Sequence, residues 1–365
     1  MLPTRFSSVI DLIQVLQSVP SRSLILAVPA LLASIFCASC QQNVADIAPL
    51  DPPKISIPPG FPQPFVPADD PWTPAKTELG RYLFYSPELS GNEQFSCASC
   101  HKMSAAFCDP GQHWSFGSTG QHGSRNTLSL LNLAYDTCFF WDGRAKSLEE
   151  QALEPIFNPI ELDNDSATLI LHVKRNSLFS PLFIRAFGSD SVTMTRIAQA
   201  LASFERTLIS GTSAYDAFRL GDSEAISESA KRGLALFSSK SINCIACHSG
   251  INFTDNGYHS NGLDLHYLDA GLENLTNDPD DNGKFRTPTL RNVALTAPYM
   301  HDGRFSTLEQ VLDFYNRGGM HNPTQDSLIH PLELSGQQME DIIAFLATLT
   351  DSTCISRNSF SNPFQ

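Results

Sequence analysis

The chain has 365 residues, of which 42% are hydrophobic and 17% are charged. This composition supports a buried core and excludes wholesale disorder, and the length suits two or three domains of ordinary size. There are 24 basic and 38 acidic residues, which gives a net charge of −14 without any basic run, so nucleic acid is not an expected partner.

The amino-terminal part of the sequence has the pattern of an export signal followed by a tether. An apolar run of 13 residues, 24–36, follows Arg22 and has the length of a signal-peptide core rather than of a membrane span. Small residues lead into Cys40, as at a bacterial lipoprotein cleavage site. We therefore expect a signal peptide over 1–40, a lipid anchor to the membrane through Cys40 and a periplasmic location, with an uncleaved membrane anchor as the alternative. Residues 41–75 are rich in proline and are expected to form an extended tether.

Two cysteine pairs are each followed directly by a histidine. They are Cys97, Cys100 and His101 in the first half, and Cys244, Cys247 and His248 in the second. This spacing attaches a c-type haem, because two thiols bond the porphyrin edge while the next residue offers an imidazole to the iron. A zinc site would need four ligands, and a thioredoxin-type dithiol needs no histidine. The sequence therefore predicts two covalently bound haem c groups.

Apolar residues at helical spacing precede each of these motifs and also occur near the end of the chain. The segments 75–85 and 229–238 are each similar to the first helix of a cytochrome c fold. The segment 335–349 has a serine cap and is similar to the closing helix of the same fold. Further helical patterns fill 163–230, most clearly over 194–209, and are expected to link two domains.

An internal repeat relates the two halves of the chain. Residues 141–150 (WDGRAKSLEE) and 301–310 (HDGRFSTLEQ) share a D-G-R-x-x-[ST]-L-E core without gaps. In each copy Asp-Gly makes a turn, and Ser147 or Thr307 caps a helix. The predicted fold is mainly α, with two cytochrome c-like domains related by duplication. They are expected over 76–225, including the linking helices, and over 226–352.

The repeat also predicts a difference between the two haem sites. Trp141 and His301 are equivalent residues of the repeat. Pro155 lies fourteen residues after Trp141, and Tyr315 lies fourteen residues after His301. If this position faces the open side of each haem, Tyr315 can bind iron through its phenolate, whereas Pro155 has no donor atom. The second haem would then have two protein ligands, and the first would keep a vacant position where peroxide can bind. The alternative is that Tyr315 is a core residue of an amphipathic helix.

Over roughly residues 75–350 the chain resembles the bacterial dihaem cytochrome c peroxidases and their MauG-like and MbnH-like relatives. The likeness lies in three stretches, LSGNEQFSCASCH, FWDGRAKSLEEQALEPI and KFRTPTLRNVALTAPYMHDGRFSTLEQVLDFY. It implies an N-terminal haem that reacts with peroxide, a C-terminal haem that stores or delivers an electron, and a calcium ion between the two domains. Ordinary peroxidases of the family have a methionine where Tyr315 stands. Here Met300 and Met320 are near but not at that position, and a tyrosine ligand is typical of the MauG-like and MbnH-like members.

The resemblance also assigns roles to single residues. Trp141 matches the tryptophan between the haems, Glu161 the acid–base carboxylate of the peroxide pocket, and Gln151 a glutamine of the same pocket. The residues matching the calcium positions, mostly through carbonyl oxygens, are Asn126, Thr296 and Pro298. For Glu161 a helix cap or a surface position is the alternative.

Three smaller questions stay open from the sequence. Ordinary peroxidases carry a histidine that leaves the first haem on activation, and here His113 or His122 could reach that iron, although a surface loop is favoured for both. Cys108 and Cys138 could form a disulfide in an exported domain. The acidic insert 274–282 lacks the spacing of a calcium-binding EF-hand and is expected to be a solvated loop.

Three functions remain in consideration. The first is a peroxidase that reduces hydrogen peroxide with electrons from a small cytochrome c or a cupredoxin. The second is the oxidation of a side chain on a partner protein, as the MauG-like and MbnH-like resemblance implies. The third is electron transfer without catalysis, which a vacant first haem and Glu161 disfavour. Tyr315 favours the second function over the first, because a tyrosine ligand is typical of the MauG-like and MbnH-like members.

Overall fold

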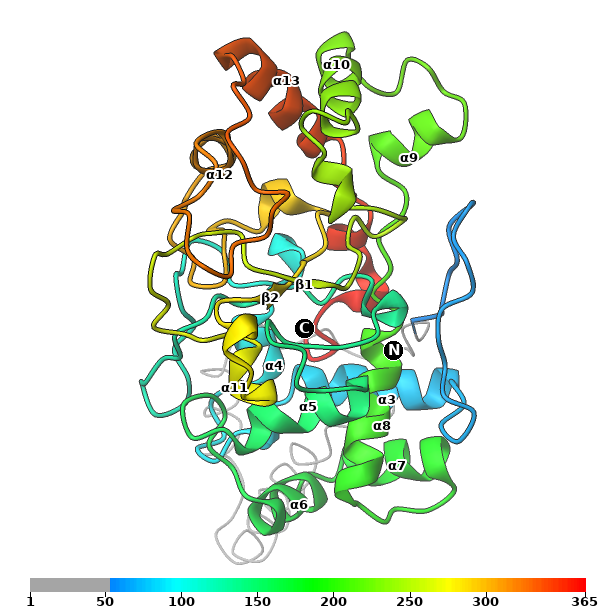
Figure 1. Ribbon diagram of the computed structural model, residues 1–365. Helices are drawn as coiled ribbons and strands as arrows, with labels where there is room; N and C mark the ends of the chain where they lie inside the picture. Colours follow the sequence, from blue (N-terminus) through cyan, green and yellow to red (C-terminus); the bar gives the residue numbers. More distant parts are fainter. Residues whose placement is uncertain (1–52) are drawn as a thin grey trace, which may run out of the picture. The chain divides into compact units, whose positions relative to one another are not determined.

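In the computed structural model, residues 53–365 are described, and they fold mainly into helices (Figure 1). The expected signal peptide, the lipid attachment at Cys40 and the first part of the proline-rich tether lie outside the described residues. Within 53–365, no helix combines the length and the apolar character needed to cross a membrane.

Eleven α-helices and one short sheet make up the regular structure of this part. The helices are α3 (Pro74–Phe84), α4 (Cys97–Cys100), α5 (Leu148–Phe157), α6 (Ser166–Arg175), α7 (Phe179–Phe187), α8 (Met194–Glu205), α9 (Ala214–Arg219), α10 (Glu228–Phe237), α11 (Glu273–Thr276), α12 (Leu308–Asn316) and α13 (Gly336–Ala347). The strands β1 (Tyr258–His259) and β2 (Phe285–Arg286) pair antiparallel. The prediction of a mainly α fold is confirmed.

Each half of the chain contains one closely packed pair of helices. In the second half α10 crosses α13, and in the first half α3 crosses α8 (Figure 1). The helices predicted over 75–85, 229–238 and 335–349 are therefore present and packed as in two copies of one fold. The segment 194–209 was expected to link the domains. Instead, α8 packs on α3 within the first half, as α13 packs on α10 within the second. Helical periodicity predicted this helix but could not predict its partner.

Both crossings are close because a glycine lies at the point of contact. A Cβ atom on Gly80 of α3 would lie 1.8 Å from the carbonyl oxygen of Ala200 in α8. A Cβ atom on Gly233 of α10 would lie 1.9 Å from the carbonyl oxygen of Asp341 in α13. No carbon can approach an oxygen so closely, so each pair of helices depends on its glycine.

We expect Gly233→Ala to destabilise the protein, although alanine favours helix formation over glycine by about 1 kcal/mol. The added methyl group must push α10 away from α13, and such overpacking typically costs about 1–3 kcal/mol. Chemical unfolding followed by circular dichroism measures the effect. Gly336→Ala is the matched control, because a Cβ on Gly336 meets no atom within 4 Å. Equal stability of both variants would contradict the close-packing explanation.

The last residues of the chain return to the first half of the molecule. Phe360 is fully buried in the core that also contains Leu79 and Phe84 of α3. The guanidinium of Arg81 donates a 2.8 Å hydrogen bond to the carbonyl of Ser359, and the hydroxyl of Tyr85 donates one of 2.7 Å to the carbonyl of Phe360. No local pattern beyond residue 352 predicts this structural role.

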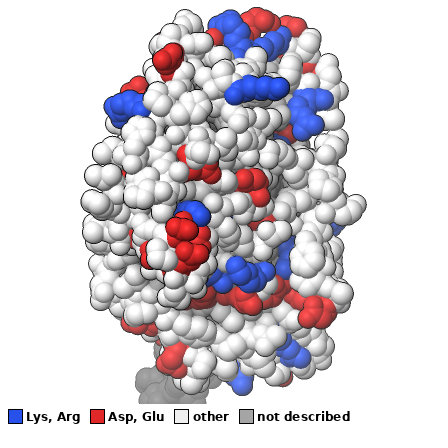
Figure 2. All heavy atoms as spheres, in the orientation of Figure 1, with Lys and Arg blue, Asp and Glu red and all other residues white. Residues whose placement is uncertain are grey.

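The surface carries charges of both signs. On the face drawn in Figure 2, lysine and arginine side chains are interspersed with aspartate and glutamate. The acidic insert 274–282 contains the end of α11 and a short 3-10 helix over Pro279–Asp281, and most of its residues are exposed. We therefore still do not expect nucleic acid as a partner, and this expectation rests on charge alone.

Candidate functional site

Each Cys-x-x-Cys-His motif lines its own cavity. Cys97, Cys100 and His101 line the first cavity, at α4. Cys244, Cys247 and His248 line the second, around the short 3-10 helix Cys244–Ala246. All four cysteines are free, so their thiols are available for thioether bonds.

The two histidines are oriented in the same way, and this orientation suits an axial ligand. The Nδ1 atom of His101 lies 2.8 Å from the carbonyl oxygen of Phe107, and that of His248 lies 3.0 Å from the carbonyl oxygen of Phe253. A carbonyl can only accept, so Nδ1 carries the proton and Nε2 is left bare for a metal. Burial lowers the pKa of both imidazoles, which keeps them neutral. The donor set of each cavity therefore fits a c-type haem.

The repeat places Pro155 and Tyr315 at equivalent points of the two cavities. Ser147 caps α5 and Thr307 caps α12, as expected, and Pro155 and Tyr315 lie at the same distance along these helices. Pro155 lines the first cavity and Tyr315 lines the second. This position therefore offers no donor atom to the first cavity and a phenol to the second.

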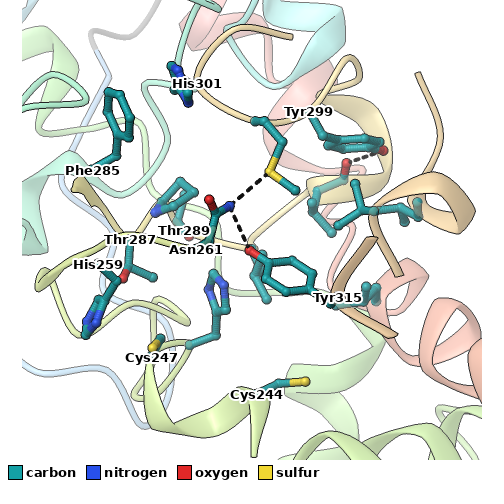
Figure 3. Close-up of a pocket in the computed structure, with 18 of the residues that line it drawn as sticks. Cys244, Cys247, His259, Asn261, Phe285, Thr287, Thr289, Tyr299, His301 and Tyr315 are labelled. Carbon is teal, nitrogen blue, oxygen red and sulfur yellow. Dashed lines mark hydrogen bonds between the residues drawn. The ribbon is translucent and has the colours of Figure 1, made fainter. Parts of the chain in front are cut away.

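The hydroxyl of Tyr315 is held by an amide. The side chain of Asn261 donates a hydrogen bond of 3.4 Å to it (Figure 3). Burial raises the pKa of Tyr315 to about 12, and the hydrogen bond from Asn261 opposes this shift. The phenol therefore keeps its proton at neutral pH unless a cation takes the place of that proton.

Glu161 lies in the wall of the first cavity and is not a surface acid. The amide of Asn158 donates a 2.7 Å hydrogen bond to its Oε1, and its backbone carbonyl accepts a 2.7 Å bond from Ser118. Burial raises the pKa of the Glu161 carboxyl, while Asn158 and Arg144 act in the opposite direction. A carboxyl in this position can hold or release a proton inside the cavity.

Two further polar side chains line the first cavity, and only one was expected. Gln151 is buried, and its Oε1 has no hydrogen-bond partner within the described residues. Glu205, at the end of α8, is also buried with an unpartnered Oε2, and burial raises its pKa to about 8. Sequence reasoning missed Glu205 because a glutamate at a helix end is ordinarily exposed.

A shared wall separates the two cavities. Trp141, Asn126 and His301 line both of them. The indole Nε1 of Trp141 donates a 2.8 Å hydrogen bond to the carbonyl of Asn126, and the Trp141 carbonyl accepts one of 2.7 Å from the amide of Arg286 in β2. The rings of Trp141 and His301 meet edge to face, with centroids 6.5 Å apart. The equivalent residues of the repeat thus lie side by side between the cavities.

The three predicted calcium residues lie around the second cavity. Asn126, Thr296 and Pro298 all line it, and the Asn126 amide nitrogen donates to the carbonyls of Gln112 and His113. Across residues 53–365, neither the Thr296 nor the Pro298 carbonyl oxygen accepts a hydrogen bond. Free neutral oxygens of this kind suit calcium. The calcium site stays a prediction.

Two of the open questions have structural answers. His113 and His122 are exposed and are not among the residues that line the first cavity, and the His122 ring stacks on Trp114 with centroids 4.7 Å apart. Cys108 and Cys138 are both free cysteines, so the structure does not contain the disulfide that the sequence allowed. The Cys138 sulfur instead accepts a 3.2 Å hydrogen bond from the hydroxyl of Tyr258.

Comparisons with known proteins agree with this two-cavity arrangement. A family model described as di-haem cytochrome c peroxidase matches residues 74–224, and one described as cytochrome c matches residues 230–350. The methylamine utilization protein MauG of Methylophilus methylotrophus is 39% identical over 290 residues, covering 78% of this chain and 84% of that protein. The cytochrome-c peroxidase IdrP1 of Pseudomonas sp. (strain SCT) is 36% identical, covering 88% and 91%. The crystal structure of a MauG-like protein associated with microbial copper homeostasis matches with a TM-score of 0.82 at 34% identity, covering 86% of this chain and 99% of that one.

Proposed function

This chain belongs to the di-haem cytochrome c peroxidase family, and from that premise we propose that it reduces hydrogen peroxide in the first cavity with electrons that arrive through the second. Family membership brings two haem c groups and an oxidoreductase activity of the peroxidase type. The observation that carries the proposal is the different residue at one repeat position, Pro155 in the first cavity and Tyr315 in the second.

The chain's own residues would hold the two haems in different ways. His101 and His248 would each offer Nε2 to an iron, and Tyr315 would offer a phenolate oxygen in the second cavity. When bound, the haems supply an iron that reacts with peroxide and a second centre that stores one electron. Because Pro155 offers no donor atom, the first cavity keeps room for the substrate.

Glu161 is the residue that we assign to proton movement. As a carboxylate it takes the proton from one oxygen of the peroxide and gives that proton to the other oxygen, so that the O–O bond breaks and this oxygen leaves as water. Two electrons, which arrive through the second cavity, and two protons from solvent convert the remaining oxygen to a second water. The raised pKa of Glu161 brings the group closer to the pH at which both steps are efficient. The unpartnered Oε1 of Gln151 can accept a hydrogen bond from the bound peroxide and so orient it.

Trp141 is the residue that we assign to electron transfer between the sites. Its ring belongs to the wall shared by both cavities, and hydrogen bonds on its indole nitrogen and its backbone carbonyl fix its position. A fixed aromatic ring between two redox centres provides a short path for an electron.

The second candidate function is the oxidation of a side chain on a partner protein, and Tyr315 favours it. The relatives of this chain include MauG proteins as well as cytochrome-c peroxidases. The two functions share the peroxide reaction and differ in where the electrons come from. In the first they come from a small cytochrome c or a cupredoxin, and in the second from a residue of the partner protein.

One experiment separates these functions. The purified diferric protein is mixed with peroxide, with and without reduced small cytochrome c, and absorption is followed into the near infrared. Steady oxidation of the cytochrome supports the peroxidase function. A long-lived near-infrared charge-resonance band with slow cytochrome oxidation supports the partner-oxidising function. No spectral response to peroxide would overturn both.

We expect Tyr315→Phe to remove the phenolate bands from the resonance Raman spectrum of the second haem. It should also raise the reduction potential of that haem, because an anionic oxygen stabilises ferric iron. The spectrum should become that of a five-coordinate or ligand-switched haem. An unchanged spectrum would mean that Tyr315 is a core residue and not a ligand.

We also propose that the protein is exported to the periplasm and anchored there through Cys40. The pattern of residues 1–40 and the two haem-attachment motifs support this location. Fractionation of cells that express the full chain, with a Cys40→Ser variant as control, tests it. Release of the variant into the soluble periplasmic fraction is expected, and equal membrane retention of both proteins would contradict the anchor.

A further inference from the structure

A sulfur atom lies beside the phenol in the second cavity. Met300 and Tyr315 both line this cavity. The amide nitrogen of Asn261 donates to the Tyr315 hydroxyl at 3.4 Å and to the Met300 sulfur at 3.5 Å, and Figure 3 draws both bonds as dashed lines. A single amide therefore holds two potential iron ligands next to each other.

The repeat shows that the direction of Met300 is a property of the fold. Met300 directly precedes His301, as Phe140 directly precedes Trp141. Both Met300 and Phe140 have a left-handed backbone, with φ of 74° and 68°, which non-glycine residues rarely adopt. Each lines the cavity of its own half. The duplicated turn thus points this side chain at the cavity in both halves.

The chemistry at that position differs between the halves. In the first half Phe140 has no donor atom, and its ring lies under the guanidinium of Arg144 at 3.6 Å. In the second half the same position carries a thioether. The first cavity therefore lacks a donor at both repeat positions, Phe140 and Pro155, and the second cavity has a donor at both, Met300 and Tyr315.

The two donors of the second cavity suit different oxidation states of iron. A phenolate is a hard anion that stabilises ferric iron, whereas a neutral thioether is a soft ligand that stabilises the reduced state and raises the potential. A site that must accept an electron and release it again passes through both states.

We propose that Met300 is a second, alternative ligand of the second haem, and that it replaces Tyr315 when this haem is reduced. On reduction, one electron from a protein donor or from dithionite enters the iron, the Tyr315 oxygen leaves and takes up one proton, and the Met300 sulfur forms the new bond. On oxidation each step reverses. The inference rests on the proposed assignment of Tyr315 as a ligand, and it adds a change of ligand to that assignment.

The test uses the protein with both haems attached and compares Met300→Leu with Met320→Leu. Met320 is the matched control, because the residue is 55% exposed and it is not among the residues that line either cavity. Resonance Raman spectra are recorded for the diferric protein and after reduction with dithionite, and the potential of the second haem is titrated. For Met300→Leu we expect unchanged ferric phenolate bands, loss of the six-coordinate ferrous spectrum and a shift to lower potential. Met320→Leu should match the unaltered protein.

A second variant keeps the proposal testable if Met300→Leu does not fold. In Tyr315→Phe the Met300 sulfur should bind the ferric iron as well and give a sulfur-to-iron charge-transfer band. That band should vanish in the double variant Tyr315→Phe/Met300→Leu.

The outcomes that overturn the proposal are distinct. The first outcome is that Met300→Leu has the ferrous spectrum and the potential of the unaltered protein, while Tyr315→Phe loses the phenolate bands as expected. This outcome overturns the ligand exchange alone. An unchanged ferric spectrum of Tyr315→Phe overturns both the exchange and the assignment of Tyr315. Neither result affects the peroxide reaction at Glu161, which is measured separately.

Discussion

Glu161→Gln is expected to slow the reaction of the diferric protein with peroxide by about 10²–10⁴-fold, the usual contribution of a positioned acid–base group. The glutamine keeps the shape of the side chain and can still contact Asn158, whose amide lies 2.7 Å from Oε1. It cannot take a proton from peroxide at neutral pH. Both haems should remain attached, so stopped-flow absorption at matched haem content measures the effect.

Glu161→Gln should also remove the rise of the rate with pH that the Glu161 carboxyl causes. The carboxylate form of Glu161 accepts the first proton, so the rate rises as pH increases through the pKa of this group. Because burial raises that pKa, this limb of the profile lies at higher pH than for an exposed glutamate. Glu150→Gln, on the exposed side of α5, should keep both the rate and the profile. A rate for Glu161→Gln within twofold of the unaltered protein would exclude the proton-transfer role.

Asp216→Ala is expected to lower the free energy of unfolding by about 3–5 kcal/mol, as for other buried ion pairs that lose one partner. Asp216 accepts two hydrogen bonds from the guanidinium of Arg291, at 2.6 and 2.9 Å, and both side chains are buried. Without Asp216 the Arg291 charge would remain in the interior, 5.0 Å from the ring centroid of Phe61 and 5.6 Å from that of Phe253, with no counter-ion. Chemical denaturation of the protein measures the loss.

Glu228→Gln is the control for this ion pair. Glu228 pairs with Lys231 on the surface of α10, three residues along the same helix. Water screens such exposed pairs, so no measurable change in the unfolding midpoint is expected. Similar losses of unfolding free energy in both variants would mean that burial does not explain the contribution of the Arg291–Asp216 pair to stability.

Much of the fold and the site could be predicted from the sequence because the signals are local. The spacing of the Cys-x-x-Cys-His motifs, the serine and threonine caps and the helical periodicity each depend on only a few neighbouring residues. The match between Pro155 and Tyr315 could be counted because the repeat has no gaps and both residues lie on helices with the same start.

The remaining features depend on contacts between distant residues, which no local pattern encodes. The pairing of α8 with α3 needs Gly80 to meet Ala200, and the return of Phe360 to the first core spans most of the chain. Asn261 looks like an ordinary loop residue until the fold brings it to Tyr315. The same applies to Glu205, which enters the first cavity only because α8 closes that half.

The position of Phe360 has a consequence for biosynthesis. Residues that follow the second half in the sequence complete the core of the first half, through Phe360 and the hydrogen bonds that the carbonyls of Ser359 and Phe360 accept from Arg81 and Tyr85. A nascent chain that has not yet reached Phe360 has an unfinished first core, whatever the state of the second. The first half therefore cannot complete its core before the second half has been synthesised, and a stop codon after residue 352 should harm the half of the protein farthest from it in the sequence.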